Sequence, residues 1–271
     1  ALYFTPMLNA QQQAVVAHGD GALLVIAGAG TGKTTVMAHR AAALIGRGLD
    51  PGRLLLLTFT RRAANELKRR VAGLLRDQGL DLPWAGTFHS VAVRLLRQHG
   101  GLIGIDPGFS ILDESDSRDL LGLAAEPEAE REAAETPPDP AAPDKDGFPP
   151  KGVLCRLYSY QRNTELPLPE VMARIAPTHA KRQEALQRVF AAYEERKKAS
   201  HGLDFDDLLH AWRDLLRSPH GAALDLFDAV MVDEYQDTNT RQAGILEGLC
   251  RRHHRLTVVG DDAQAIYAFR G

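Results

Sequence analysis

Residues 27–34 read Ala-Gly-Ala-Gly-Thr-Gly-Lys-Thr, and they directly follow the apolar run Ala22-Leu23-Leu24-Val25-Ile26. A short apolar run that ends in a glycine-rich turn predicts a strand leading into a phosphate-binding loop. Glycines let the backbone N–H groups of such a loop turn inward around phosphates, at the N-terminus of the next helix. Apolar residues at helical spacing indicate that helix: Val36, Met37, Ala41, Leu44 and Ile45. The stretch therefore predicts an α/β fold that binds a nucleoside triphosphate.

Two side chains of the loop have specific expected roles. Lys33 supplies a point charge for the β- and γ-phosphates, and the Thr34 hydroxyl is a ligand for Mg²⁺. One position departs from the general pattern, which opens with Gly where this chain has Ala27. The expected nucleotide-binding residues are Gly28, Ala29, Gly30, Thr31, Gly32, Lys33, Thr34 and Thr35.

An acidic cluster follows a second apolar run. Residues 229–232 read Ala-Val-Met-Val, and 233–237 read Asp-Glu-Tyr-Gln-Asp. In a parallel α/β sheet, ligands bind at the carboxyl ends of the strands. Asp233 is therefore expected to hold Mg²⁺ through its water shell, and Glu234 to polarise the attacking water. Taken alone, the cluster also fits a solvated acidic turn, but together with the phosphate-binding loop it favours a hydrolase.

Further segments surround these two sites in a fixed order. Leu8, Asn9 and Gln12 precede the loop, and Gln12 lies twenty-one residues before Lys33. The later segments are TFTRRAANEL at 58–67, GTFHS at 86–90, FSILDE at 109–114, LDFDDLL at 203–209, DEYQDTN at 233–239 and VGDDAQAIYAFRG at 259–271. In this order and spacing, the chain resembles the motor half of the UvrD/PcrA/Rep group of superfamily 1A DNA helicases. The resemblance covers 8–271, with a weaker middle between 115 and 200.

The resemblance implies a fold and an activity. The fold would be a RecA-like P-loop NTPase domain, with a mainly parallel sheet, formed by residues 1–114 and 204–271. Residues 115–203 would form an inserted helical subdomain. Gln12 would read the base, so the nucleotide would be ATP, and Gln264 would sense the γ-phosphate. The activity would be that of an ATP-dependent DNA helicase that translocates 3′→5′ on single-stranded DNA in repair or replication.

The same resemblance implies a DNA-binding surface that contacts single strands and junctions between single- and double-stranded DNA. Its expected residues are Phe59, Thr60, Thr87, His89, Tyr267, Phe269 and Arg270. Without the resemblance, Phe59 reads as a core residue, and the aromatics at 267 and 269 fit a half-buried strand end almost as well. His89 has no His, Cys or carboxylate at ligand spacing, which argues against a metal site there.

Two departures from the family pattern affect these expectations. The residue after Thr34 is often Arg in such helicases, so a nucleotide contact from Thr35 is in doubt. The aromatic residue at 269 is often Trp, and Phe269 keeps a stacking face but has less area and no N–H donor. Neither change removes the expected chemistry.

Composition fits a soluble intracellular enzyme, and the resemblance implies a cytoplasmic, nucleoid-associated bacterial protein. The chain has 271 residues, of which 44% are hydrophobic, and no apolar run approaches the length of a membrane span. Cys155 and Cys250 are far apart and fit no metal or redox pattern, which suits a reducing compartment. Frequent Ala, Arg, Gly and Leu suggest a GC-rich genome.

Charge divides unevenly along the chain. Residues 113–146 hold twelve acidic and three basic residues, a net of −9, whereas the whole chain carries −3. The remainder is therefore basic by six charges, which is compatible with nucleic-acid binding. Seven prolines and many glutamates in 124–150 predict a flexible acidic loop, with a regulatory contact as the alternative. Apolar spacing predicts a helix over 61–76, with Thr60 as its N-cap. A second helix is predicted over 181–199, with one apolar face formed by Leu186, Val189, Phe190 and Tyr193.

The family couples ATP to movement through a second RecA-like domain, which carries an arginine finger. The sequence to Gly271 contains no segment that resembles this second half. We therefore expect a fragment, either expressed as such or produced by a split or truncated gene, whose second domain is supplied in cis or in trans. One alternative is an ATP-dependent binding module that switches contacts without translocating. Another is a helicase–nuclease subunit, which would need a nuclease domain that the sequence does not show.

Overall fold

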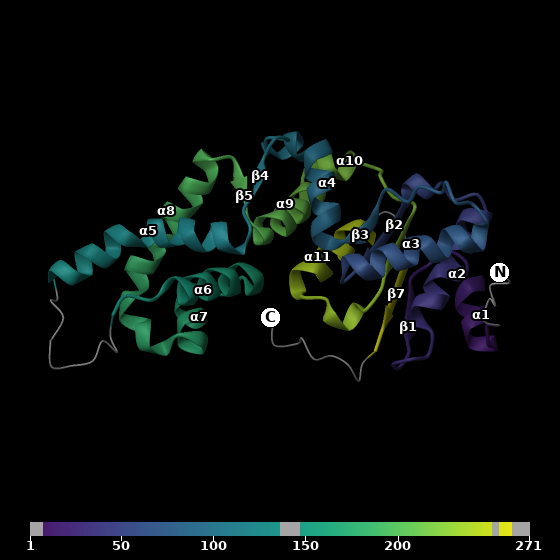
Figure 1. Ribbon diagram of the computed structural model, residues 1–271, viewed down its shortest axis with the longest axis horizontal. Coiled ribbons are helices and arrows are strands. Elements are labelled where there is room, and N and C mark those ends of the chain that lie inside the picture. Colours follow the sequence, from purple (N-terminus) through teal and green to yellow (C-terminus); the bar gives the residue numbers. More distant parts are fainter. Residues whose placement is uncertain (1–7, 136–146, 251–254, 262–271) are drawn as a thin grey trace. The chain divides into compact units, whose positions relative to one another are not determined.

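The computed structural model describes residues 8–135, 147–250 and 255–261 (Figure 1). The described chain divides into two compact units. Unit 1 comprises the described residues up to 95 and those from 212 onward, and unit 2 comprises residues 96–211. Both boundaries fall within helices, whereas the division expected from the sequence lay at 114 and 204.

A five-stranded parallel sheet forms the centre of unit 1 in the described residues. Its order is β1-β7-β6-β2-β3. The strands are β1 Leu23–Ile26, β2 Leu54–Thr58, β3 Ala85–Thr87, β6 Ala229–Val232 and β7 Leu256–Gly260. This is the mixed α/β architecture with a parallel central sheet that the sequence predicted, and it is consistent with a RecA-like helicase domain.

The central strands are apolar on both faces because both faces are covered. Every residue of β2 and β6 is buried. Successive side chains of a strand point to opposite faces, so Leu54 and Leu56 line one face while Leu55 and Leu57 line the other. The first pair packs with Met37, Leu67 and other residues of the flanking helices. Parallel sheets covered in this way read as continuous hydrophobic runs.

Helices complete unit 1. They include α1 Ala10–Ala17, α2 Lys33–Gly46, α3 Arg61–Leu75, α10 Pro219–Ala223 and α11 Thr240–Cys250. Helices α4 Phe88–His99 and α9 Phe205–Arg217 contain the unit boundaries. Short 3-10 turns lie at Pro51–Arg53 and Tyr235–Asp237. The expected helix over 61–76 is confirmed as α3, which Thr60 caps by accepting from the Ala63 N–H at 3.1 Å.

Unit 2 is mainly helical. Its elements are α5 Glu114–Glu135, α6 Lys151–Thr164, α7 Leu168–Ile175, α8 Gln183–Ala199, the two-residue strands β4 Ser110–Ile111 and β5 Gly202–Leu203, and 3-10 turns at Gly100–Ile103 and Pro177–Arg182. The expected helix over 181–199 corresponds to α8. Its predicted apolar face, Leu186, Val189, Phe190 and Tyr193, is buried in the core of this unit.

The flexible loop expected over 124–150 is wrong for residues 124–135, which continue helix α5. Ala124 and Ala125 are buried in the unit 2 core, and Pro127 lies inside the helix. Glu128 is also buried and accepts two hydrogen bonds from Arg188 of α8, at 2.9 and 2.8 Å. Glu132 likewise accepts from Arg182 Nε at 2.9 Å. Two glutamates of this segment are thus paired with arginines that come later in the chain, and charge composition alone does not reveal such pairing.

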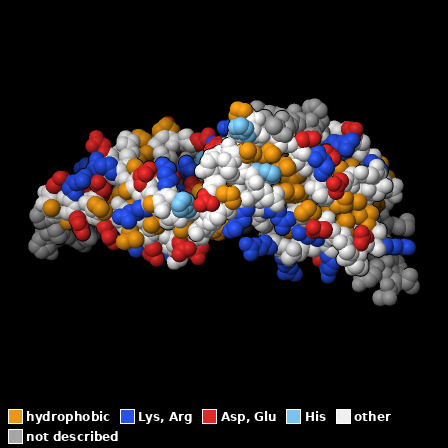
Figure 2. Space-filling view, turned by 90° about the horizontal axis from the view of Figure 1, so that it is seen from above, with side chains coloured by type: hydrophobic (Ala, Val, Ile, Leu, Met, Phe, Trp, Pro, Cys, Tyr) orange, Lys and Arg blue, Asp and Glu red, His pale blue; other side chains and the backbone are white. Residues whose placement is uncertain are grey.

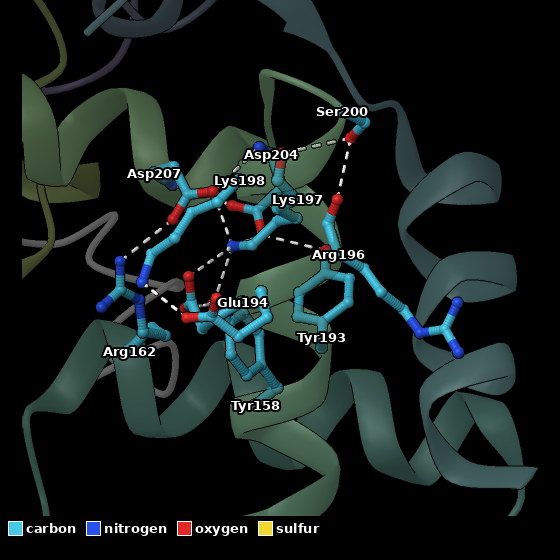
Figure 3. A network of polar contacts seen from close by, with 11 residues as sticks. Tyr158, Arg162, Tyr193, Glu194, Arg196, Lys197, Lys198, Ser200, Asp204 and Asp207 are labelled. Atoms are coloured by element: carbon cyan, nitrogen blue, oxygen red, sulfur yellow. Dashed lines mark hydrogen bonds and ion pairs between the residues drawn. The ribbon is translucent and has the colours of Figure 1, made fainter.

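A buried ionic network joins α8 to the start of α9 (Figure 3). The Lys197 ammonium donates to Asp204 at 2.8 Å, to Asp207 at 2.6 Å and to the Tyr158 hydroxyl at 2.9 Å. Asp204 and Asp207 also cap each other's backbone N–H groups. Burying a charge is costly unless it is paired and hydrogen-bonded, as Lys197 is here. The LDFDDLL segment at 203–209 therefore has a structural role within unit 2.

Candidate nucleotide site and nucleic-acid interface

The carboxyl ends of the parallel strands bring the sequence motifs together. The loop 27–32 follows β1, Asp233 and Glu234 follow β6, and Asp261 follows β7. Because β7 lies between β1 and β6, all three segments meet at one edge of the sheet. This edge is where ligands bind in open α/β folds.

The loop owes its shape to two glycines with positive φ. Gly30 has φ 74° and Gly32 has φ 89°, a region that other residues rarely adopt. Gly32 is the residue before α2, so the loop ends at the helix N-terminus, where free N–H groups favour an anion. A Cβ at position 32 would also lie only 3.3 Å from the Gln12 Nε2 atom. The backbone angle favours glycine at this position, and a larger residue would also have to displace the Gln12 amide slightly.

Lys33 lies between two carboxylates. Its Nζ atom is 3.5 Å from Glu234 Oε2 and 3.7 Å from Asp261 Oδ2. The lysine and Asp261 side chains are 8% and 3% exposed, so these charges interact where water screens them poorly. The lysine is thus held at the site by anions whose charge a bound phosphate would replace. The sequence offered no role for Asp261, because its proximity to Lys33 arises only from the pairing of β7 with β1 and β6.

Thr34 and Asp233 form an oxygen pair suited to a hard divalent cation. The Thr34 hydroxyl lies 3.5 Å from Asp233 Oδ2. Burial, and then the neighbouring Glu234, raise the pKa of Asp233 to about 6. A buried carboxylate with a raised pKa is one that a cation would stabilise, and Mg²⁺ binds through one or two carboxylates together with substrate phosphates and waters. No cluster of three or more His, Cys, Asp or Glu ligands occurs in the described residues.

Glu234 has an unusual backbone and an amide neighbour. It adopts φ 53° and ψ 47°, the left-handed region, which costs a non-glycine residue free energy and often marks functional sites. Gln236 Nε2 donates to Glu234 Oε2 at 2.7 Å, and Gln236 Oε1 accepts from the Asp261 N–H at 2.9 Å. The glutamine thus bridges the ends of β6 and β7. Sequence reasoning assigned no role to Gln236, because the bridge depends on tertiary structure.

Gln12 lies next to the phosphate-binding loop. Its Nε2 donates to the Thr31 carbonyl at 3.0 Å, while Oε1 accepts from the Asn9 N–H at 2.9 Å. Asn9 returns a bond by accepting from the Gln12 N–H, which completes a capping box at the start of α1. The amide retains one N–H and one lone pair, which suits contact with the edge of a base.

Thr35, whose nucleotide contact was in doubt, has a protein partner. Its hydroxyl accepts from Arg70 Nη1 of α3 at 2.9 Å. Glu66 holds the same arginine through its Nε at 2.7 Å. An arginine therefore reaches the first turn of α2 from another helix.

The described DNA-binding candidates lie near the same edge of the sheet. Phe59 follows β2 directly and is 39% exposed, so it is not the core residue that its type alone suggests. The Thr60 hydroxyl caps α3. Thr87 ends β3, and its hydroxyl accepts from the Ser90 N–H at 3.2 Å, close to half-buried His89. Gln264, Tyr267, Phe269 and Arg270 lie outside the described residues.

Charges of both signs cover the face that Figure 2 draws. Lys and Arg side chains are interspersed there with Asp and Glu, and hydrophobic side chains are exposed between them.

Among the described helices, none combines the length and the apolar composition that a membrane span needs. Both cysteines are free, and burial raises the pKa of Cys250 to about 11.

Comparison with known proteins identifies the family of this chain. The family model of the UvrD/REP helicase N-terminal domain matches residues 8–271. The chain belongs to this family.

Curated relatives are named as helicases. The chain is 37% identical over 271 residues to ATP-dependent DNA helicase PcrA of Bacillus subtilis and 36% identical over 268 residues to PcrA of Leuconostoc citreum. It is also 36% identical over 276 residues to ATP-dependent DNA helicase UvrD1 of Mycobacterium tuberculosis. Each match covers 97% of this chain but 34% of the relative, so the chain spans about a third of the length of these proteins.

Proposed function

We propose that this chain is the ATP-binding motor half of an ATP-dependent DNA helicase that translocates on single-stranded DNA. The observation that carries the proposal is the meeting of Lys33, Glu234 and Asp261 beside the glycine loop, at one edge of a parallel sheet. The names of the relatives support DNA as the second substrate. The 3′→5′ direction and a role in repair or replication rest on the family resemblance.

In this proposal, residues 28–35 bind the triphosphate. The backbone N–H groups of the loop and the start of α2 hold the phosphates, and Lys33 exchanges its carboxylate partners for phosphate oxygens. Gln12 contacts the adenine edge, which makes ATP the preferred nucleotide. Thr34 and Asp233 are the residues that would hold Mg²⁺, and the ion would neutralise phosphate charge.

Hydrolysis needs an oriented water and a balanced charge. Glu234 is the proposed base that polarises this water, and its displacement from Lys33 by the γ-phosphate frees the carboxylate for that role. Gln264 is the proposed γ-phosphate sensor. An arginine from a facing domain would cover the other side of the phosphate, a contribution of ~10³–10⁵ in rate for known NTPases.

The proposed DNA surface contains Phe59, Thr60, Thr87 and His89, together with Tyr267, Phe269 and Arg270. Phe59 would stack on an unpaired base, and Thr87 and His89 would donate to phosphates. Unwinding would also require a second RecA-like domain, in cis or in trans, corresponding to sequence that the relatives possess beyond the aligned third. The bacterial nucleoid in the cytoplasm is where such a protein would meet its DNA.

The competing function is an ATP-dependent binding module that switches its contacts without turnover. ATP hydrolysis by the purified chain in excess over radiolabelled ATP, with and without a single-stranded oligonucleotide, distinguishes the two. The motor half should hydrolyse slowly and lose this activity in Glu234→Gln. A chain that binds ATP and changes its DNA affinity with no hydrolysis above that of Glu234→Gln would support the binding module and contradict our proposal.

A further inference from the structure

Helix α1, which carries Gln12, is held in place mainly by hydrogen bonds. None of its residues is buried, although it lies against α2 (Figure 1). Its first turn is tied to the phosphate-binding loop by the Gln12–Thr31 bond at 3.0 Å. The carbonyls of its last turn have no partner within the helix and need donors from elsewhere. The position of Gln12 therefore depends on what binds those carbonyls.

Two arginines of the α2 segment supply the donors. Arg40 is 2% exposed, and its Nη1 donates to the carbonyls of Val15 and His18 at 2.8 and 2.9 Å. Its Nε donates to Thr257 Oγ1 of β7 at 2.8 Å. Arg47, which is exposed, adds a bond from Nη2 to the Val16 carbonyl at 3.1 Å.

The chemistry of this contact suits a fixed positive charge that holds the C-terminal end of α1. Burial, and then the charge of Arg47, lower the pKa of Arg40, yet an arginine remains protonated in proteins. The three oxygens that accept from Arg40 are all neutral, and two of them belong to the negative end of the α1 dipole. A planar guanidinium can reach three acceptors at fixed angles, whereas a lysine ammonium at the same position could not.

Arg40 lies two helical turns after Lys33 on the same helix. One rigid element thus carries the phosphate-binding lysine at its start and the anchor of α1 in its middle. We propose that Arg40, assisted by Arg47, is a positioning residue for Gln12, and so sets the selectivity of this site for an adenine nucleotide over bare polyphosphate. This inference rests on the proposed function, in which Gln12 contacts the base.

The expected effect follows from the population of docked α1. If Gln12 contacts the base only when α1 is packed against α2, weakening that packing lowers the apparent ATP affinity. The apparent affinity is then proportional to the fraction of molecules in which α1 remains packed. The same change leaves affinity for inorganic tripolyphosphate unchanged, because that ligand does not contact Gln12. One hydrogen bond of ordinary net strength is equivalent to a change of about two- to tenfold in an equilibrium constant.

The test compares calorimetric dissociation constants for ATP and for inorganic tripolyphosphate, both with Mg²⁺. Gln12→Ala is the reference and should lower the preference for ATP by about tenfold. Arg40→Lys should lower the same preference by about fivefold, and Arg47→Met by about twofold, with tripolyphosphate affinity unchanged. Thr257→Val is the matched control, because it removes a bond of the same guanidinium without touching α1. It should lower the melting temperature and leave the preference intact.

The outcomes separate the two levels of the argument. No change in Gln12→Ala would contradict base reading by Gln12, and with it that part of the proposed function. If Gln12→Ala lowers the preference for ATP but both arginine variants keep it in full, the positioning role of Arg40 is contradicted and base contact by Gln12 is not. If Thr257→Val and Arg40→Lys lower the preference for ATP by the same factor, Arg40 has a structural role only. If Arg40→Lys does not fold, Arg47→Met decides, with faster amide exchange in α1 as the accompanying result.

Discussion

Asp233→Asn should stabilise the protein in the absence of nucleotide at neutral pH. The Asp233 side chain is 5% exposed, and burial followed by the charge of Glu234 raises its pKa from 3.8 to about 6. A raised carboxyl pKa means that the native state binds the proton more tightly than the unfolded state does. This group therefore favours folding fully below pH 3.8, and the advantage is lost as pH rises through 6.

The shift sets the size of the effect. Two pKa units are equivalent to about 3 kcal/mol, since each unit is worth 1.36 kcal/mol. The Glu234 N–H donates to Asp233 Oδ1 and the Thr34 hydroxyl to Oδ2. Asparagine keeps an oxygen for the Glu234 N–H and can donate its NH2 group to the Thr34 hydroxyl, but it does not ionise. The free energy of unfolding of the variant, relative to wild type, should rise by about 2 kcal/mol between pH 4.5 and 7.5. Stability and metal binding are thus opposed at this residue.

Urea unfolding of both proteins across this pH range measures the difference, in which titrating groups that do not interact with residue 233 cancel. Glu66→Gln is a control of opposite sign, because hydrogen bonds from Arg70 and Arg69 hold the pKa of Glu66 below its usual value. That variant should lose stability relative to wild type as pH rises. A difference between Asp233→Asn and wild type that does not change with pH would refute the argument from burial.

Three further changes test the site. Glu234→Gln should keep ATP affinity but slow single-turnover hydrolysis by ~10²–10⁴, measured by quench flow, and unchanged hydrolysis would exclude Glu234 as the base. Phe59→Ala should weaken single-stranded DNA binding by about tenfold in fluorescence anisotropy, and equal affinities would exclude Phe59 from the DNA surface. For wild type, the logarithm of the binding constant should fall with the logarithm of the salt concentration with a slope of about −2 to −3. Gly32→Ala should lower the unfolding free energy by about 1–2 kcal/mol through its φ of 89° and should weaken ATP binding, and an unaffected variant would contradict the strained-loop geometry.

The fold was predictable where the local pattern of apolar residues matches the burial that the folded structure requires. The apolar runs 22–26, 54–57 and 229–232 all contain strands. The buried strands β2 and β6 need apolar side chains on both faces, whereas β1 lies at the edge of the sheet with Leu24 and Ile26 exposed. The carboxyl ends of these strands then bring Lys33 and Glu234 together, as the motif order predicted. Thr60 identified the start of α3 through its side chain.

Other features depend on partners distant in sequence. Residues 124–135 read as a loop because their glutamates and Pro127 suggest disorder, but Glu128 is matched by Arg188, sixty residues later. Arg40 reads as an ordinary helix residue, and its burial under α1 follows only from the docking of that helix. Gln236 and Asp261 acquire their contacts from the adjacency of β6 and β7. Periodicity and composition carry no signal for such pairings.

Isothermal titration of ATP–Mg²⁺ into wild type and Lys33→Ala is the most direct test of the central claim, that residues 28–35 with Asp233 bind ATP. We expect clear binding by wild type, a loss of at least tenfold in Lys33→Ala, and little change in melting temperature. Lys33 interacts with both Glu234 and Asp261, so a parallel thermal scan is the control for folding. Equal affinities for ATP in two folded proteins would contradict the account.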